Sequence, residues 1–101
     1  NPVAPNFQLL QNTPNPFNPE TWIPYELEEA AEPTLIINDI FGRLIQKINV
    51  GQQTAGSYNS KESAIFWDGR DMFGYHVQTG IYYYTLTAGK NSETRKMIVI
   101  R

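Results

Sequence analysis

The only histidine of the chain, His76, is the first residue to consider for catalysis. A Ser-His-Asp triad would have to use it, but it lies in a glycine-bounded segment with no serine near it in sequence. Paired carboxylates are another catalytic device, and they need a fixed separation inside a cleft. The acidic residues at 26–32 instead have the pattern of a solvated loop. We therefore interpret His76 as a loop or surface residue and predict no catalytic residue.

The segment from Asp68 to Gly74 places two carboxylates beside glycines, which superficially resembles a calcium loop. It departs from the D-x-[DN]-x-[DN]-G pattern, because Arg70 and Met72 occupy the third and fifth positions. We expect Asp68 to cap a turn by accepting backbone hydrogen bonds instead. The chain also has no cysteine and no phosphate-binding glycine loop, so we predict neither a metal site nor a cofactor.

Composition narrows the class of protein further. With 101 residues the chain is one small domain, too small to combine a deep substrate cleft with a cofactor. Eight Lys and Arg stand against ten Asp and Glu, for a net charge of −2 without a basic cluster, which argues against nucleic acid and anionic membranes as partners. No apolar run approaches the roughly 20 residues that span a bilayer, so we expect no membrane insertion. Together these features argue against an enzyme.

The distribution of proline and glycine predicts strands rather than helices. All seven prolines lie at or before Pro33, and all seven glycines lie at or after Gly42 with strand-length segments between them. Apolar residues alternate at period two, as at Ile23, Tyr25 and Leu27. We therefore predict an all-β sandwich of about seven antiparallel strands. The clearest are residues 21–27, 34–40, 44–50, 63–67, 81–87 and 94–100.

The aromatic residues are too numerous for all of them to be at the surface. Trp67 precedes the Asp68-Gly69 turn, so we expect its ring to be buried at a strand end. Only one face of residues 81–87 can be buried in a two-layer sandwich, so some rings must remain exposed. A row of exposed rings is typical of carbohydrate-binding sandwiches, and that class stays open. The rings expected at the surface are those of Trp22, Phe73, Tyr75 and Tyr83.

The last strand has two different faces. Its alternation directs Met97 and Val99 toward the core and Lys96, Ile98 and Ile100 outward. If this strand lies at a sheet edge, its free backbone groups are available to add to the sheet of a partner.

Five ordered motifs carry a resemblance to a known family. They are Asn15-Pro16-Phe17-Asn18-Pro19-Glu20-Thr21, Tyr25-Glu26-Leu27, Asp39-Ile40-Phe41-Gly42-Arg43, Trp67-Asp68-Gly69-Arg70-Asp71 with Gly74, and Gly80-Ile81-Tyr82-Tyr83-Tyr84 leading to Lys96-Met97-Ile98-Val99. Over residues 12–101 the chain resembles the C-terminal sorting domains of the type IX secretion system and the related immunoglobulin-like domain of the flagellar hook-capping protein. Asn38, where the family usually has an aromatic residue, and the long link at 57–63 depart from the pattern.

The resemblance implies an immunoglobulin-like sandwich over residues 12–101, preceded by a linker at 1–11 from a missing upstream cargo domain. It implies a non-catalytic domain that directs a larger exported protein from the periplasm through the type IX secretion machinery, to be secreted or attached to the cell surface after a surface peptidase acts. The recognised residues would be Lys96, Met97, Ile98, Val99, Ile100 and Arg101. The structural residues would be Asn15, Pro16, Phe17, Asn18, Pro19, Trp67, Asp68, Gly69, Gly74 and Gly80, with Gly74 and Gly80 supplying backbone freedom. The hook-capping relative implies an alternative role in the assembly of an extracellular filament.

Overall fold

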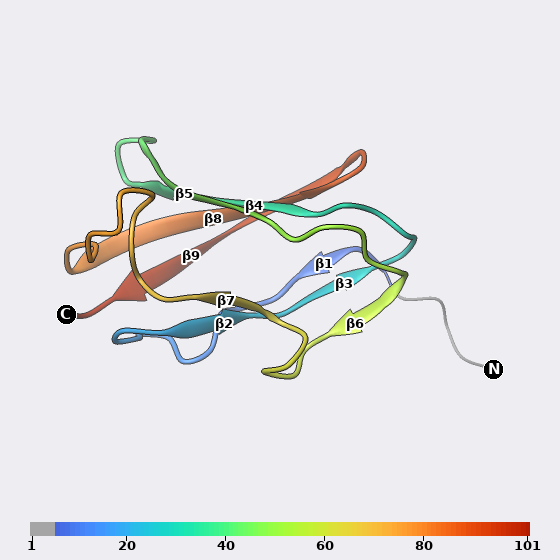
Figure 1. Ribbon diagram of the computed structural model, residues 1–101, viewed down its shortest axis with the longest axis horizontal. Helices are drawn as coiled ribbons and strands as arrows, with labels where there is room; N and C mark the ends of the chain where they lie inside the picture. The colour runs from blue at the N-terminus through green and yellow to red at the C-terminus, as the bar shows by residue number, and fades with distance from the viewer. Residues whose placement is uncertain (1–5) are drawn as a thin grey trace.

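The computed structural model describes residues 6–101, which form nine β-strands (Figure 1). No helix capable of crossing a membrane occurs within these residues. The strands are β1 (Gln8–Leu9), β2 (Thr21–Ile23), β3 (Tyr25–Leu27), β4 (Thr34–Asp39), β5 (Leu44–Asn49), β6 (Gly56–Tyr58), β7 (Ile65–Trp67), β8 (Gly80–Ala88) and β9 (Asn91–Val99).

Two layers of strands face each other across the core (Figure 1). One layer is a four-stranded sheet in the order β5-β4-β8-β9. The other consists of two shorter sheets, β1-β3-β6 and β2-β7. All of the strand pairs are antiparallel. This arrangement confirms the predicted all-β antiparallel sandwich.

Pro24 divides the strand that the sequence predicts at 21–27. Without an N–H group, proline cannot continue a hydrogen-bonded ladder. The chain therefore changes partners there: β2 pairs with β7, whereas β3 pairs with β1 and β6. The Pro24 carbonyl accepts a hydrogen bond from Leu10 at 3.0 Å. This division is one reason why the fold has nine strands where about seven were predicted.

Two strands lie where the sequence predicts none. β6 falls partly in the long link at 57–63, and its Tyr58 ring stacks on Tyr25 with centroids 4.8 Å apart. β1 falls in the segment 1–11 predicted to be a linker, and Leu9 is fully buried in the core. The linker prediction is therefore wrong for Gln8 and Leu9, because a two-residue strand is too short to show a period. Residues 1–5 lie outside the described residues.

Alternate residues of the four-stranded sheet build one side of the core. In β8, Tyr82, Tyr84 and Leu86 are buried, and Ile81 and Tyr83 lie on the outer face. The Tyr84 hydroxyl donates to the Leu10 carbonyl at 2.8 Å and accepts from the Asn12 N–H at 2.9 Å. Burial raises the pKa of this hydroxyl to about 12. The core is thereby tied to the segment that precedes β2.

The turn between β4 and β5 is held by the carboxylate of Asp39. It accepts hydrogen bonds from the backbone N–H groups of Phe41 and Arg43, both at 2.9 Å, and from Arg43 Nε at 2.7 Å. Burial alone would raise the pKa of Asp39. The hydrogen bonds from Arg43 and Phe41 outweigh that effect, so the pKa lies below its usual value.

We predict that Trp67→Ala destabilises the fold by about 3–5 kcal/mol, because the ring is buried and its removal leaves a cavity. The neighbouring Phe66 is 45% exposed and provides a control on the same strand. Phe66→Ala should cost less than about 1.5 kcal/mol. Urea titration measures both values, and a loss below about 1 kcal/mol for Trp67→Ala would show that the ring is not part of the core.

The Asp39 carboxylate should make stability depend on pH. Because its pKa is lowered in the fold, its contribution is present above the unfolded value of about 4 and is lost as the pH falls through the folded pKa. Asp39→Asn should therefore lower the free energy of unfolding most at neutral pH, with the difference from wild type shrinking in acid. Urea titrations at a series of pH values measure this, and a difference that does not change with pH would contradict the account.

Candidate functional site

The last residues of the chain form one edge of the four-stranded sheet. In β9, Met97 and Val99 face the core and are buried, as the alternation predicts. Lys96, Ile98 and Ile100 are exposed. The terminal segment therefore presents apolar and basic side chains on its outer face.

The backbone of this edge is already used by the chain itself. The Phe17 N–H donates to the Ile98 carbonyl at 3.1 Å, and the Ile100 N–H donates to the Phe17 carbonyl at 3.0 Å. The side-chain oxygen of Asn15 accepts the Ile98 N–H at 2.9 Å. The expectation that these backbone groups are free to add to a partner's sheet is therefore wrong.

The covering segment extends further along β9. The Gln11 side chain donates to the Lys96 carbonyl at 2.9 Å. At Leu9, the N–H donates to the Glu93 carboxylate and the carbonyl accepts from Arg95 Nε, both at 2.6 Å. We call residues 9–17 the N-terminal cover. Because the cover occupies this edge, residues 96–100 present their side chains to a partner.

The proline motif and the Trp67 turn meet beneath this edge. The Phe17 ring lies edge-on to Trp67, with centroids 5.6 Å apart. The Trp67 indole N–H donates to the Arg70 carbonyl at 2.9 Å. A Cβ atom at Gly69 would lie 2.6 Å from the Pro19 carbonyl oxygen, and the Gly69 φ is +78°. These contacts give the two motifs a packing role.

A pocket of about 260 Å³ joins the same motifs to the end of the chain. Val77 and Val99, both largely buried, form its apolar part. Its polar lining comes from Asn18, His76 and Arg101. The structure thus brings together residues that the sequence singled out separately, and it places His76 among them in a loop, as expected.

The two aspartates of the calcium-like segment hold turns. The Asp68 carboxylate accepts the Arg70 N–H at 3.1 Å, which confirms its predicted capping role. The Asp71 carboxylate accepts the N–H groups of Phe73 and Tyr75 at 2.9 and 3.0 Å. Within residues 6–101, no group of three or more His, Cys, Asp or Glu is placed to hold a metal ion.

The two loop glycines expected to supply backbone freedom differ. Gly74 has a φ of +91°, in the region that favours glycine. Gly80 does not have a positive φ, and it is the first residue of β8. The conformational role predicted for Gly80 is therefore wrong, because this residue begins a strand rather than turning a loop.

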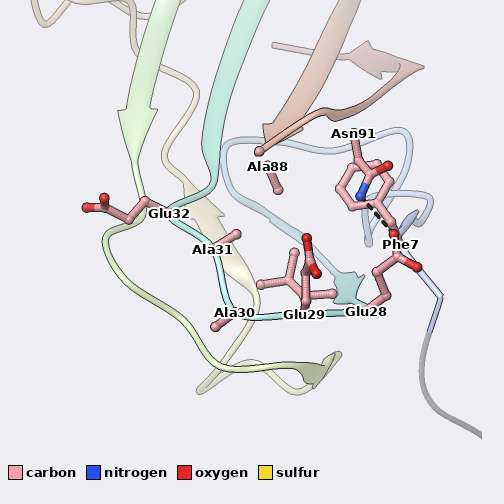
Figure 2. A pocket seen from close by; sticks show the side chains of 10 residues that line it. Phe7, Glu28, Glu29, Ala30, Ala31, Glu32, Ala88 and Asn91 are labelled. Carbon is pink, nitrogen blue, oxygen red and sulfur yellow. Dashed lines mark hydrogen bonds between the residues drawn. The ribbon is translucent and has the colours of Figure 1, made fainter.

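The acidic loop lies at the far end of the sandwich, next to the turn between β8 and β9. A pocket of about 310 Å³ lies there, lined by Phe7, by residues 27–32 and by Ala88, Gly89 and Asn91 (Figure 2). Glu28, Glu29 and Glu32 are exposed, and Asn91 donates to Glu28 at 3.0 Å. This is the solvated acidic loop that the sequence predicts.

The exposed rings are spread over both layers rather than gathered in one row. Phe73 and Tyr75 are 76% and 72% exposed, as predicted, and Tyr83 lies on the outer face of β8. Trp22 is only half-buried, and its ring packs against that of Phe66, its neighbour across the β2–β7 pair in the layer that faces β8. These positions therefore give no specific support to a sugar-binding platform.

Phe41, at the turn of the Asp39-Ile40-Phe41-Gly42-Arg43 motif, is exposed although the sequence did not predict it. Its ring is 75% exposed, with the Arg43 guanidinium 5.3 Å from the ring centroid. The glycine that closes this turn was the available signal, because a residue at the tip of a tight hairpin has few neighbours.

Comparison with known proteins agrees with this geometry. The structure defines an immunoglobulin-like β-sandwich, and the family model described as the FlgD Ig-like domain matches residues 18–92. The chain belongs to that family. No match was found among curated protein sequences.

Several solved structures share the fold. They include dimeric latent PorU from Porphyromonas gingivalis, with a TM-score of 0.72 and 19% identity over 97% of this chain. PorZ, described as an essential bacterial surface component of the type IX secretion system of the same organism, has a TM-score of 0.60 and 22% identity over 90% of this chain. FlgD from P. aeruginosa has a TM-score of 0.57 and 25% identity over 74% of this chain. The chain covers 10% of the PorU chain, 11% of the PorZ chain and 54% of the FlgD chain.

The close approach of Gly69 to Pro19 can be tested with a matched pair of glycines. Gly69→Ala combines a positive φ with a backbone clash, whereas Gly74→Ala has a positive φ and nothing within 4 Å. We expect Gly74→Ala to cost about 1–2 kcal/mol and Gly69→Ala to cost clearly more. Urea titration of both variants measures the difference, and equal losses would show that the contact with Pro19 is unimportant.

Proposed function

We propose that this domain is a non-catalytic sorting domain, which directs a larger exported protein through the type IX secretion machinery to the cell surface. The recognised feature is the outer surface of residues 96–101, and the motif at 15–19 with the Trp67 turn supports it from beneath. The protein that it would accompany is joined upstream of β1.

One observation carries the proposal. Ile98 and Ile100 lie on the terminal segment, where they are 37% and 47% exposed and are not part of the buried core. Ile98 pairs with Ile81 of β8, so the two exposed apolar side chains are neighbours across the strands. Lys96 and Arg101 flank this apolar surface. A surface of this kind suits recognition by another protein better than it suits folding.

The fold likeness to PorU and PorZ supports the type IX assignment. PorZ is itself described as a component of that system, and its matching part covers 11% of its chain, as expected for one domain of a larger protein. The residue motifs that resemble sorting domains are all within residues 15–99. The proposal also includes an attached cargo protein and a surface peptidase that cleaves the exported protein.

The family match favours a second candidate function. The chain belongs to the FlgD Ig-like family, and FlgD from P. aeruginosa shares 25% identity over 74% of it. A domain of this kind would act as a structural module in the assembly of an extracellular filament. Export of an attached cargo protein separates the two candidates, because only the sorting function requires it.

We predict that Lys96→Ala combined with Ile98→Ser impairs the export of a fused cargo protein without unfolding the domain. Both side chains are exposed, so the core keeps Met97 and Val99. The matched control is Thr87→Ala with Lys90→Ala, two exposed positions at the other end of the same hairpin, which should leave export unchanged. Surface display of the cargo is the readout, and circular dichroism confirms folding first.

Deletion of residues 96–101 should abolish export completely. This deletion also removes the buried Met97 and Val99, so its effect combines loss of signal with loss of fold. Normal display of the cargo after the deletion would contradict the sorting function. Equal export by the double variant and its control would show that Lys96 and Ile98 are not the recognised residues.

A further inference from the structure

The two edges of the four-stranded sheet differ in their hydrogen bonding. The N-terminal cover occupies the β9 edge along much of its length, whereas β5, the opposite edge, is bonded by the loop after β7 at Ile45, where the Met72 N–H donates to the Ile45 carbonyl at 2.9 Å. The Val50 N–H donates to the Pro33 carbonyl at 3.0 Å. Along an antiparallel strand, every second residue bonds to the neighbouring strand, so this bond determines which residues of β5 bond to β4. Ile48 therefore bonds to β4, and the backbone groups of Lys47 and Asn49 point away from the sheet.

In the facing layer, β7 also has backbone groups that point away from its sheet. Trp22 exchanges two backbone hydrogen bonds with Thr13, both at 2.9 Å, on the side away from β7. Trp22 lies opposite Phe66 in the ladder between β2 and β7. Because bonding alternates along an antiparallel pair, the Phe66 backbone groups point away from β2, toward the open side of the sandwich.

These two edges line one cleft of about 500 Å³, which we call the seam. Its lining comes from Gln46–Asn49 of β5 and from Phe66, Trp67 and Asp68. Of the outward backbone groups of Lys47, Asn49 and Phe66, only the Lys47 N–H has a hydrogen-bond partner among residues 6–101. That partner is the side-chain oxygen of Gln46 at 2.9 Å, which a competing carbonyl can replace.

We propose that the seam binds an extended segment of a partner protein by strand addition, with apolar and acidic residues alternating along the segment. The unpaired backbone groups would supply main-chain hydrogen bonds to the added strand. Side chains on its inner face would meet the half-buried Ile48, which favours apolar residues. Those on its outer face would lie beside the exposed Lys47, which favours acidic residues.

The charge of the seam also bears on which occupant it takes. Two copies of β5 paired edge to edge would bring their Lys47 side chains together, and like charges across strands are destabilising. Asp68 lies at one end of the seam, where Arg70 Nε is 3.9 Å from its carboxylate. A foreign acidic segment therefore fits better than a second copy. This inference is independent of the sorting function, because it uses the edge opposite to β9.

The probe is an eight-residue peptide with blocked ends, in which valine and glutamate alternate. It is titrated into the isotope-labelled 101-residue chain and followed by NMR. We expect the amide signals of Lys47, Asn49 and Phe66 to shift and their hydrogen exchange to slow, with no change at Ile98. A peptide with N-methyl groups on alternate residues cannot pair and should not bind.

Variants of β5 test the mode of binding. Asn49→Pro removes one outward N–H while leaving the bonds from Ile48 to β4, so it should abolish binding, whereas Asn49→Ala should retain it. Lys47→Glu should weaken binding at least about tenfold, equivalent to about 1.4 kcal/mol. Lys90→Glu, which changes charge at the distant β8–β9 turn, should leave binding unchanged. The dispersion of the NMR spectrum reports whether each variant is folded.

Three results would overturn the proposal. The first is the absence of shifts at Lys47, Asn49 and Phe66 at about 1 mM peptide. The second is equal binding by the N-methylated peptide. This comparison uses only the wild-type chain, so it does not depend on whether a variant folds. The third is concentration-dependent protection of the same amides without peptide, which would make a second copy the occupant.

Discussion

The hydrogen bonds between the N-terminal cover and β9 connect the two layers of the sandwich along one edge. Phe17 bonds through both its N–H and its carbonyl to the backbone of residues 98–100. The same residue places its ring against Trp67 in the core. One short segment thus joins the last strand to the facing layer, and the Gly69 turn approaches Pro19, two residues beyond Phe17.

The cover also determines what each side of the sandwich offers to a partner. At β9 the backbone is occupied, so recognition there depends on exposed side chains such as Ile98 and Ile100. At β5, the opposite edge of the sheet, outward backbone groups of Lys47 and Asn49 are available to a partner, so recognition there would depend on main-chain pairing. The acidic loop lies at the far end from the final residues (Figure 1), and Phe7 lines the same pocket as that loop. A cargo joined upstream would therefore lie away from the proposed signal.

The sequence predicts most of the fold because strong local signals agree with one another. Period-two alternation correctly assigned the buried and exposed faces of β8 and β9, and the Asp68-Gly69 turn correctly placed Trp67 in the core. The division at Pro24 and the pairing of β1 depend on contacts between distant residues, which leave no local pattern. For the same reason the sequence identified β9 as an edge candidate but not the segment that covers it.

Native-state hydrogen exchange of the Ile98 and Ile100 amides measures whether the N-terminal cover occupies the β9 edge in solution. If the cover occupies the β9 edge, both amides should be protected nearly as well as those in the middle of β8, and Asn15→Ala should release Ile98 while leaving Ile100 protected. Fast exchange of both amides in the wild-type chain, at the rate of a solvent-exposed strand edge, would contradict the account.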